Sequence, residues 1–270
     1  MIVTVVTPTL NGAAFLEACI ASVQKNRGPH YEIDHVIVDA GSTDDTIEIA
    51  RRHGLRIMQG KDEGIFDAIN KGSFNSKGDL LGFLGSDDIM LDGALEAIVS
   101  AYRQSGCGWV VGGIQWIDER GNSLGELAAP PSWMTARMQV CLGWNPVMHM
   151  STYFSRALFE QLGGFDIAYK DAGDYELFAR ALTIEPYARV AKPLTCFRRT
   201  GNNNSVVNAK RANGEARRVL ETFGPRSDWE RLVWKQILKG WFNLRNPSWM
   251  TRKVLRSLHT RIDPAVPTYF

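Results

Sequence analysis

The chain has 270 residues, 44% of them apolar and 22% charged, with a net charge of +2, a composition typical of a soluble globular protein. It holds no apolar run near the roughly 20 residues that a membrane span needs, and its first residues lack the pattern of a signal peptide. The four cysteines are not closely spaced, which indicates neither a zinc site nor a disulfide framework and favours a cytoplasmic protein.

Strands and helices alternate in the first part of the chain. Short β-branched runs predict strands, and apolar residues at helical spacing predict the helices between them. The expected strands are 3–7, 33–39, 55–58, 80–84 and 109–117, and the expected helices are 13–25, 43–53, 65–75 and 91–103. This alternation predicts an α/β fold with a mainly parallel, Rossmann-like sheet flanked by helices on both faces.

The pattern is less regular after residue 117. Residues 118–122 are typical of a hairpin turn and 149–154 of a strand, and helices are expected at 155–162 and 173–183. From residue 208 the sequence is mostly helical. We therefore expect one α/β domain over 1–207 and a helical extension over 208–270.

The extension differs from the body in charge and in aromatic content. Residues 210–270 carry 13 Lys and Arg against 5 Asp and Glu, whereas residues 1–209 carry 18 against 24. Half of the eight tryptophans lie in it, namely Trp229, Trp234, Trp241 and Trp249. This composition suits a peripheral contact with anionic lipid at the inner face of the cell membrane. The alternative is helices packed on the body with Trp in the seam. A nucleic-acid partner is not expected, because the body is acidic and no recognised motif is present.

Polar residues follow three of the expected strands at the point where each one ends. They are Thr7-Pro8-Thr9, Asp39 and the pair Asp87-Asp88. Ligands of open α/β sheets bind beyond the carboxyl ends of the strands, so these three segments predict a shared binding site.

The pair Asp87-Asp88 directly follows the apolar run 80–84. Adjacent carboxylates repel each other, and burial penalises the charge of each one further. A divalent cation that bridges to a phosphate ligand relieves both penalties, and Mn²⁺ or Mg²⁺ is therefore expected here. The alternative is a solvated turn that caps the helix beginning near Asp92.

Several segments together resemble the inverting family 2 glycosyltransferases, which have the GT-A fold. They are 7–12, 38–46, 62–72, 78–88, 163–166 and 172–177, in the family's order over about residues 1–200. The resemblance implies a nucleotide-diphosphate sugar as donor. Asp39 would read the nucleobase, Thr7 and Pro8 would line the base and ribose, Asp87 would contact the ribose or sugar, and Asp88 would bind the metal ion.

Two further groups of residues are assigned to the donor side. The resemblance places Asp67 and Asn70 near the donor, although Asp67 and Lys71 are four residues apart and would also pair on the surface of a helix. Arg198 and Arg199 are candidates to close over the diphosphate from a mobile loop, since Arg matches phosphate geometry; surface charge is the alternative.

Inversion needs a base that takes the proton of the acceptor hydroxyl on the face opposite the leaving group. By resemblance this base is Asp174, with Asp171 as the competitor. Many relatives carry Glu-Asp where this chain has Gly173-Asp174, so the first acid is missing. His149 is a candidate for the acceptor side, and a structural histidine is the alternative.

The leading hypothesis is an inverting glycosyltransferase that uses a nucleotide-diphosphate sugar, a UDP-sugar by family frequency. Its acceptor would be a glycan or lipid-linked oligosaccharide in surface polysaccharide synthesis. One alternative is a sugar nucleotidyltransferase, but such enzymes usually carry an early Gly-rich loop with basic residues, which 7–12 lacks. The other is an inactive relative that binds nucleotide or glycan.

Overall fold

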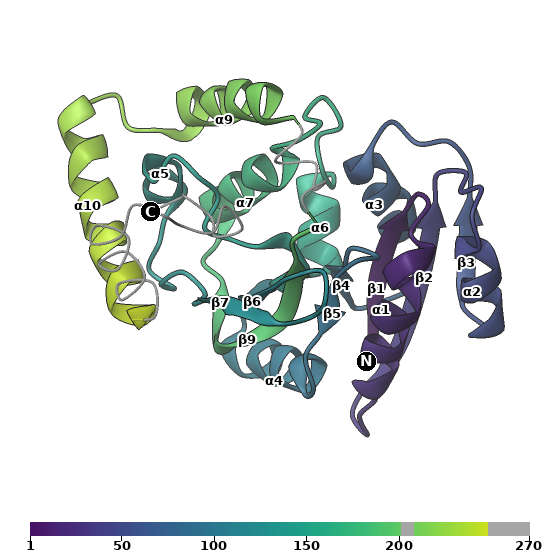
Figure 1. Cartoon of the computed structure of the whole chain (residues 1–270). Helices are drawn as coiled ribbons and strands as arrows, with labels where there is room; N and C mark the ends of the chain where they lie inside the picture. The colour runs from purple at the N-terminus through teal and green to yellow at the C-terminus, as the bar shows by residue number, and fades with distance from the viewer. Residues whose placement is uncertain (201–207, 248–270) are drawn as a thin grey trace.

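The computed structural model describes residues 1–200 and 208–247, which form one large sheet, the helices around it and two C-terminal helices (Figure 1). The strands are β1 (Ile2–Thr9), β2 (Glu32–Asp39), β3 (Arg56–Gln59), β4 (Leu80–Phe83), β5 (Ile89–Met90), β6 (Trp109–Ile117), β7 (Ser123–Leu127), β8 (Thr152–Ser155) and β9 (Ala188–Arg198). The helices are α1 (Ala13–Lys25), α2 (Thr46–Arg52), α3 (Ile65–Phe74), α4 (Ala94–Ser105), α5 (Ala136–Cys141), the 3-10 helix η1 (His149–Ser151), α6 (Arg156–Leu162), α7 (Gly173–Ile184), α9 (Ala209–Phe223) and α10 (Asp228–Arg245).

The sheet has the strand order β3-β2-β1-β4-β8-β6-β9-β5, and β7 pairs with β6. The first four strands of this order are parallel to one another, which confirms the predicted Rossmann-like half. The rest of the sheet is mixed, because β8 runs antiparallel to both of its neighbours, β4 and β6, while β6 and β9 are parallel. The predicted hairpin turn is confirmed between β6 and β7, where Gly121 has a φ of 88° and donates to the carbonyl of Asp118.

Helices cover both faces of the parallel half, as predicted. The side chains of Ile37 and Val38 point to opposite faces of β2. The α1 and α2 helices pack on Ile37 through Leu16, Ile20 and Ile49. On the other face α3 approaches so closely that a Cβ atom at Gly72 would lie 2.5 Å from Val6 and 2.9 Å from Val38. Only glycine allows this separation between helix and sheet.

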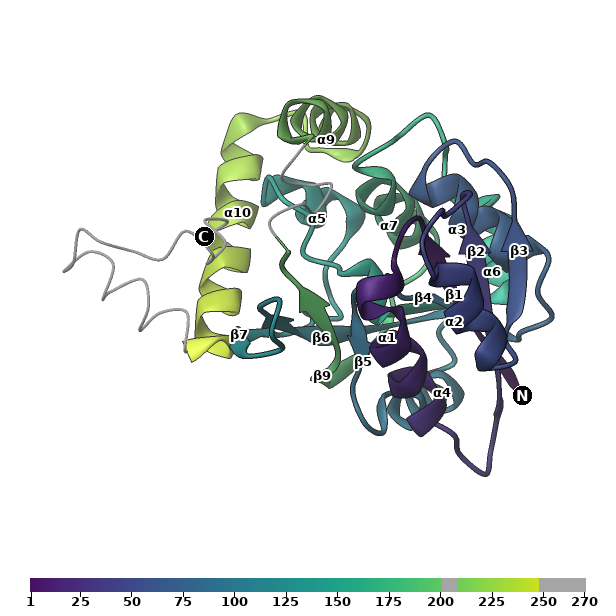
Figure 2. The ribbon, with the colours of Figure 1, turned by 45° about the vertical axis from the view of Figure 1, so that its right-hand side comes forward.

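The two C-terminal helices pack on the body, α9 against α5 and α7 and α10 against α5 (Figures 1 and 2). Buried Val219 anchors α9, and buried Leu238 and Phe242 anchor α10. The helical prediction for the extension is thus confirmed as far as Arg245, whereas Trp249 and the expected boundary at 207 lie outside the described residues. No helix in the described part of the chain is long and apolar enough to cross a lipid bilayer.

Candidate active site

The loops after β1, β2 and β4 meet at one edge of the sheet. Asn11 takes the left-handed conformation with a φ of 53°. Its backbone nitrogen donates to Oγ of Ser42 (2.8 Å), and its side-chain oxygen accepts from the backbone nitrogen of Thr43 (2.9 Å). Gly12 lies against the loop after β4, since a Cβ atom there would stand 2.8 Å from Oγ of Ser86. The three segments predicted to share a site therefore lie together.

Asp39, the last residue of β2, is fully buried, and its carboxylate stabilises the loop that follows the strand. Its carboxylate accepts from the backbone nitrogens of Gly41 and Ser42, both at 3.0 Å, and from the Ser42 hydroxyl. Asp39 does not cap a helix, because α2 begins only after Asp45. The carboxylate is held rigidly at the strand end.

The side chain of Thr7 does not match its expected place. Its hydroxyl lies 2.9 Å from Nε2 of His35 on the neighbouring strand, inside the sheet, and both residues are buried. Burial lowers the pKa of His35 to about 4, so this ring is neutral at neutral pH. Thr7 as a whole is 0% exposed, so the half-buried Pro8 is the part of this pair that remains for a nucleotide.

Asp87 and Asp88 follow β4 and are the most electrostatically strained groups of the site. The side chain of Asp88 is only 2% exposed, and Oδ1 accepts from the backbone nitrogen of Arg198 at 3.0 Å. Burial, and after it the charge of Asp87, raises the pKa of Asp88 well above its ordinary value. Burial also raises the pKa of Asp87, against the opposing charges of Arg198 and His149. The positive charges near the pair therefore do not offset the cost of burying its two carboxylates.

A divalent cation fits this pair. The described residues contain no cluster of three or more His, Cys, Asp or Glu side chains that would enclose a metal by themselves. Mg²⁺-type sites, however, commonly use one or two carboxylates and complete their shell with substrate phosphates and water. Asp88 and Asp87 supply the carboxylates of such a site, and the phosphates of a bound substrate would complete the shell of the ion.

Arg198 lies in the sheet and not in a mobile loop as expected. It is the last residue of β9 and is 6% exposed. Its guanidinium group donates to the carbonyls of Asp87 (2.9 Å) and Glu119 (2.9 Å) and lies over the ring of Phe15. Arg198 thus fixes the loop that carries the two carboxylates, and Arg199 after it donates its backbone nitrogen to Ile117.

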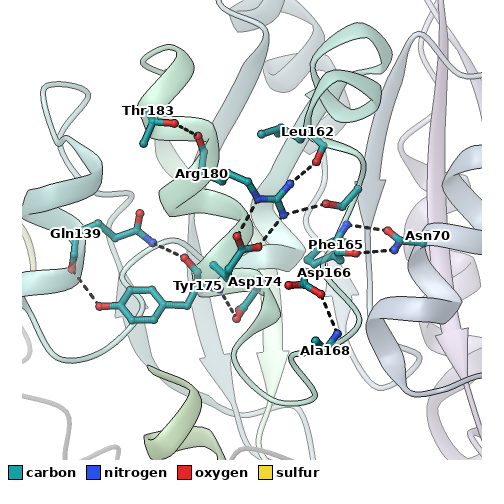
Figure 3. A network of polar contacts seen from close by, with 12 residues as sticks. Asn70, Gln139, Leu162, Phe165, Asp166, Ala168, Asp174, Tyr175, Arg180 and Thr183 are labelled. Carbon is teal, nitrogen blue, oxygen red and sulfur yellow. Dashed lines mark hydrogen bonds and ion pairs between the residues drawn. The ribbon is translucent and has the colours of Figure 1, made fainter. Parts of the chain in front are cut away.

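The two α3 residues have different partners. Asp67 forms the ion pair with Lys71 at 2.7 Å that helical spacing allows, and it accepts from the backbone nitrogen of Glu63. The Asn70 side chain bonds both backbone groups of Phe165, at 2.9 Å and 2.8 Å (Figure 3). Asn70 is therefore engaged in holding the turn around Phe165, which differs from the expected donor contact.

This turn, residues 163–166, connects α3 to α7. Arg180 of α7 donates to the carbonyls of Leu162 and Gly164 and pairs with Glu176 at 2.7 Å (Figure 3). The ring of Phe165 stacks on Phe66 of α3 at 4.9 Å between ring centres. Sequence reasoning missed Arg180, whose role depends on contacts 16 and 18 residues away.

Asp174 is the second residue of α7, and its side chain is 21% exposed. Oδ1 accepts from the nitrogen of Tyr175 at 2.7 Å, and Oδ2 lies 3.6 Å from Nδ1 of His149. His149 begins η1, one turn before the strand that was expected to start with it. Its charge acts on Asp87 as well, so His149 lies within electrostatic reach of both acidic ends of the site.

Asp171 is in a different situation. Its side chain is only 2% exposed and forms a two-point ion pair with Arg211 of α9, with Nη2 of Arg211 3.1 Å from Oδ1. This carboxylate already has a strong cationic partner and little access to a ligand.

The missing first acid of the family pattern has a packing explanation. A Cβ atom at Gly173 would stand 2.6 Å from the ring of Phe66, well inside van der Waals contact. The start of α7 therefore lies directly on α3, and this space excludes a glutamate side chain.

The family model described as glycosyl transferase family 2 matches residues 4–163, more than half of the chain. A PGL/p-HBAD biosynthesis glycosyltransferase of Mycobacterium bovis is 28% identical over 188 residues, which make up 67% of this chain and 69% of that protein. An uncharacterized glycosyltransferase of Mycobacterium tuberculosis is 30% identical over 190 residues, 68% of this chain and 70% of that one.

Two solved structures have a similar fold. Residues 1–349 of Staphylococcus aureus TarS in complex with UDP-GlcNAc superpose with a TM-score of 0.62 at 18% identity, covering 90% of this chain and 72% of that one. The mannosyltransferase PcManGT of Pyrobaculum calidifontis, in complex with GDP-Man and Mn²⁺, gives 0.55 at 16% identity, covering 96% and 88%. At these identities the likeness concerns the fold alone. From the family match, the chain belongs to glycosyl transferase family 2 and is a nucleotide-sugar-dependent glycosyltransferase with a GT-A-like fold.

Proposed function

We propose that the protein transfers a sugar, with inversion, from a UDP-sugar to a hydroxyl group of a glycan or lipid-linked oligosaccharide. The observation that carries this proposal is the pair of buried Asp88 and half-buried Asp87 at the meeting point of the three loops, where burial raises the pKa of both carboxylates. A diphosphate with its cation is the ligand that such a pair needs. Uridine is chosen as the base by family frequency, since the two similar structures hold different nucleotide sugars, UDP-GlcNAc and GDP-Man.

On the donor side, Asp39 and Pro8 are assigned to the nucleoside, and Asp87 to the ribose or sugar. Asp88 would hold Mn²⁺ or Mg²⁺, which supplies positive charge for the departing diphosphate. Asp67 is retained as a donor contact, and Lys71 would keep it ionised and oriented. Arg198 keeps the Asp87–Asp88 loop in place.

On the acceptor side, Asp174 is the base. Its carboxylate takes the proton from the acceptor hydroxyl, whose oxygen attacks the anomeric carbon from the face opposite the diphosphate, so the configuration inverts. Asp174 is preferred over Asp171 because Arg211 occupies and covers the carboxylate of Asp171. His149, 3.6 Å from Asp174, orients the base and stands where the acceptor would approach.

We further propose that α10 rests on the anionic surface that carries a lipid-linked acceptor. Its large exposed apolar side chains are Trp229, Leu232, Ile237 and Leu244, which are 44–81% exposed. They project away from the buried anchors Leu238 and Phe242, and Lys235 and Lys239 flank them on the same helix. Apolar side chains beside lysines are the composition of helices that lie in a lipid interface.

The lipid proposal is tested by co-sedimentation with vesicles of phosphatidylglycerol and phosphatidylcholine, compared with phosphatidylcholine alone. The double variant Trp229→Ser/Leu244→Ser should lose binding to the anionic vesicles. The control is Ile184→Ser, which removes an exposed apolar side chain at the end of α7. Equal binding of all three proteins would contradict the proposal.

The transferase proposal is tested first by thermal unfolding with UDP, GDP, dTDP or CDP, each with and without Mn²⁺. At about 100 times its Kd, the correct nucleotide should add about 2.7 kcal/mol to the free energy of unfolding. A panel of UDP-sugars and glycan acceptors is then assayed for UDP release. Nucleotide binding without turnover on any acceptor, unchanged in Asp174→Asn, would favour an inactive binding relative instead.

A further inference from the structure

The residues just before the proposed base are held by a helix of the C-terminal extension. Glu215 of α9 is 6% exposed, and its carboxylate accepts from three successive backbone nitrogens. Oε1 accepts from Lys170 at 2.9 Å, and Oε2 accepts from Asp171 at 2.8 Å and from Ala172 at 2.9 Å. Asp174 follows two residues after the last of them.

These three nitrogens belong to the residues that lead into α7, which begins at Gly173. Ala172, the residue in the capping position, has no side chain that accepts a hydrogen bond, and none caps α7. Glu215 therefore binds the backbone that leads into α7 from another helix, and its negative charge lies near the positive end of the α7 dipole. Loss of its carboxylate would leave buried N–H groups without acceptors, which is costly.

A second contact fixes the side chain of the same segment. Arg211, one helical turn before Glu215, pairs with the nearly buried carboxylate of Asp171. One turn after Glu215, Val219 packs into a small apolar cluster with Ala172 and Tyr175. Successive turns of α9 thus hold the backbone and the side chains on either side of Asp174.

The segment is also tied to the donor side. Nζ of Lys170 donates to the carbonyl of Glu63 at 2.8 Å, in the loop that leads into α3 and Asp67. A shift of the segment would therefore move the base relative to the donor loop. A misplaced base lowers kcat much more than it weakens substrate binding, because the attack requires the reacting atoms to be aligned.

We propose that α9 is a clamp that positions the catalytic base, with Glu215 and Arg211 as positioning residues for Asp174. This inference rests on the proposed role of Asp174. Neither residue touches the reacting atoms; both act through the backbone of residues 170–172 and the side chain of Asp171. The C-terminal extension thereby takes part in the acceptor half of the reaction.

The clamp is tested with Glu215→Ala and Glu215→Gln in the full-length chain. The alanine variant should lower kcat at least tenfold, with the donor KM changed less than twofold, and amide hydrogen exchange of residues 170–175 should accelerate. The glutamine variant keeps one acceptor oxygen and should fall between alanine and wild type. The matched control is Glu221→Gln, which breaks the exposed Arg217–Glu221 pair on the same helix and should behave as wild type.

The hydrogen-exchange measurement needs no substrate, so it separates this inference from the proposed function. If wild type shows no turnover with any donor, the transferase proposal fails, while faster exchange in Glu215→Gln still shows that Glu215 holds residues 170–175 in place. If exchange at 170–175 and kcat are the same in Glu215→Gln, Glu221→Gln and wild type, the clamp is refuted. Should Glu215→Ala not fold, Arg211→Ala and Arg211→Lys provide the same comparison, and the lysine variant, which keeps a cation beside Asp171, should retain much of the kcat lost in Arg211→Ala.

Discussion

The two acidic ends of the site differ in burial and in the partners of their carboxylates. In the loop after β4, Asp88 is buried and Asp87 is half-buried, and burial raises the pKa of both. At the start of α7, Asp171 has Arg211 as a close partner, and Asp174 lies at a helix N-terminus near His149. The carboxylates after β4 need positive charge from a ligand, whereas Asp171 and Asp174 have an arginine and a histidine of the chain beside them. The difference fits the proposed roles of the two ends, a cationic ligand at Asp88 and a base at Asp174.

Replacement of the base should have the largest effect. Asp174→Asn keeps an oxygen that can accept from Tyr175 but has no carboxylate to take a proton. We expect kcat to fall by roughly 10²- to 10⁴-fold, with Tm and donor Kd near their wild-type values. UDP release under single-turnover conditions measures this. A kcat within threefold of wild type would remove Asp174 from the mechanism and bring Asp171 back as the base.

Neutralising Asp88, at the other acidic end of the site, should raise the stability of the metal-free protein. Asp88→Asn removes a buried charge but keeps the oxygen that accepts from Arg198, so we expect the metal-free protein to gain roughly 1 kcal/mol. For a chain of this size that is about 2–4 °C in Tm. The same variant should lose the Mn²⁺-dependent stabilisation by nucleotide.

The control for this prediction is Asp118→Asn in the β6–β7 turn. Hydrogen bonds from Asn122 lower the pKa of Asp118, so its charged form is favoured and neutralisation should not raise Tm. A gain of similar size in both variants would mean that Asp88 is not specially strained.

The packing at the start of α7 gives a smaller effect. Gly173→Ala places a methyl group against the Phe66 ring, and overpacking of this kind costs about 1–3 kcal/mol, partly offset by the better helix propensity of alanine. We expect a net loss of about 1 kcal/mol in urea unfolding. The control is Gly214→Ala in α9, where a Cβ atom would meet nothing within 4 Å and where the exchange should stabilise slightly. Equal effects would contradict the close approach of α7 to α3.

The smallest effect concerns a third carboxylate, Asp67, whose partner Lys71 lies on its own helix. Lys71→Met should change the free energy of unfolding by only about 0.2–0.5 kcal/mol, as is usual for such pairs. If Asp67 contacts the donor as proposed, Asp67→Asn should raise the donor KM much more than Lys71→Met does. Equal KM values in both variants and wild type would leave Asp67 as a surface ion pair.

The parallel half of the fold and the three loops at its edge were predictable, because each depends on a short apolar run followed directly by polar residues. The roles of Arg198, Asn70 and Glu215 were not. Arg198 reaches a loop 111 residues away, Asn70 a turn 95 residues away, and Glu215 a segment 43–45 residues away. No local spacing marks such partners, so Glu215, one of two glutamates in a basic helix, gives no sign that its carboxylate binds the backbone before another helix.

The pairing of β5 with β9 bears on the order in which the protein matures. Asp88 stands just before β5, and the nitrogen that bonds its carboxylate belongs to Arg198, 110 residues further along the chain. During synthesis, Asp88 therefore leaves the ribosome long before the strand that encloses it. The nascent chain carries an open, hydrated aspartate until β9 arrives, so the desolvation that distinguishes this carboxylate is acquired late in folding.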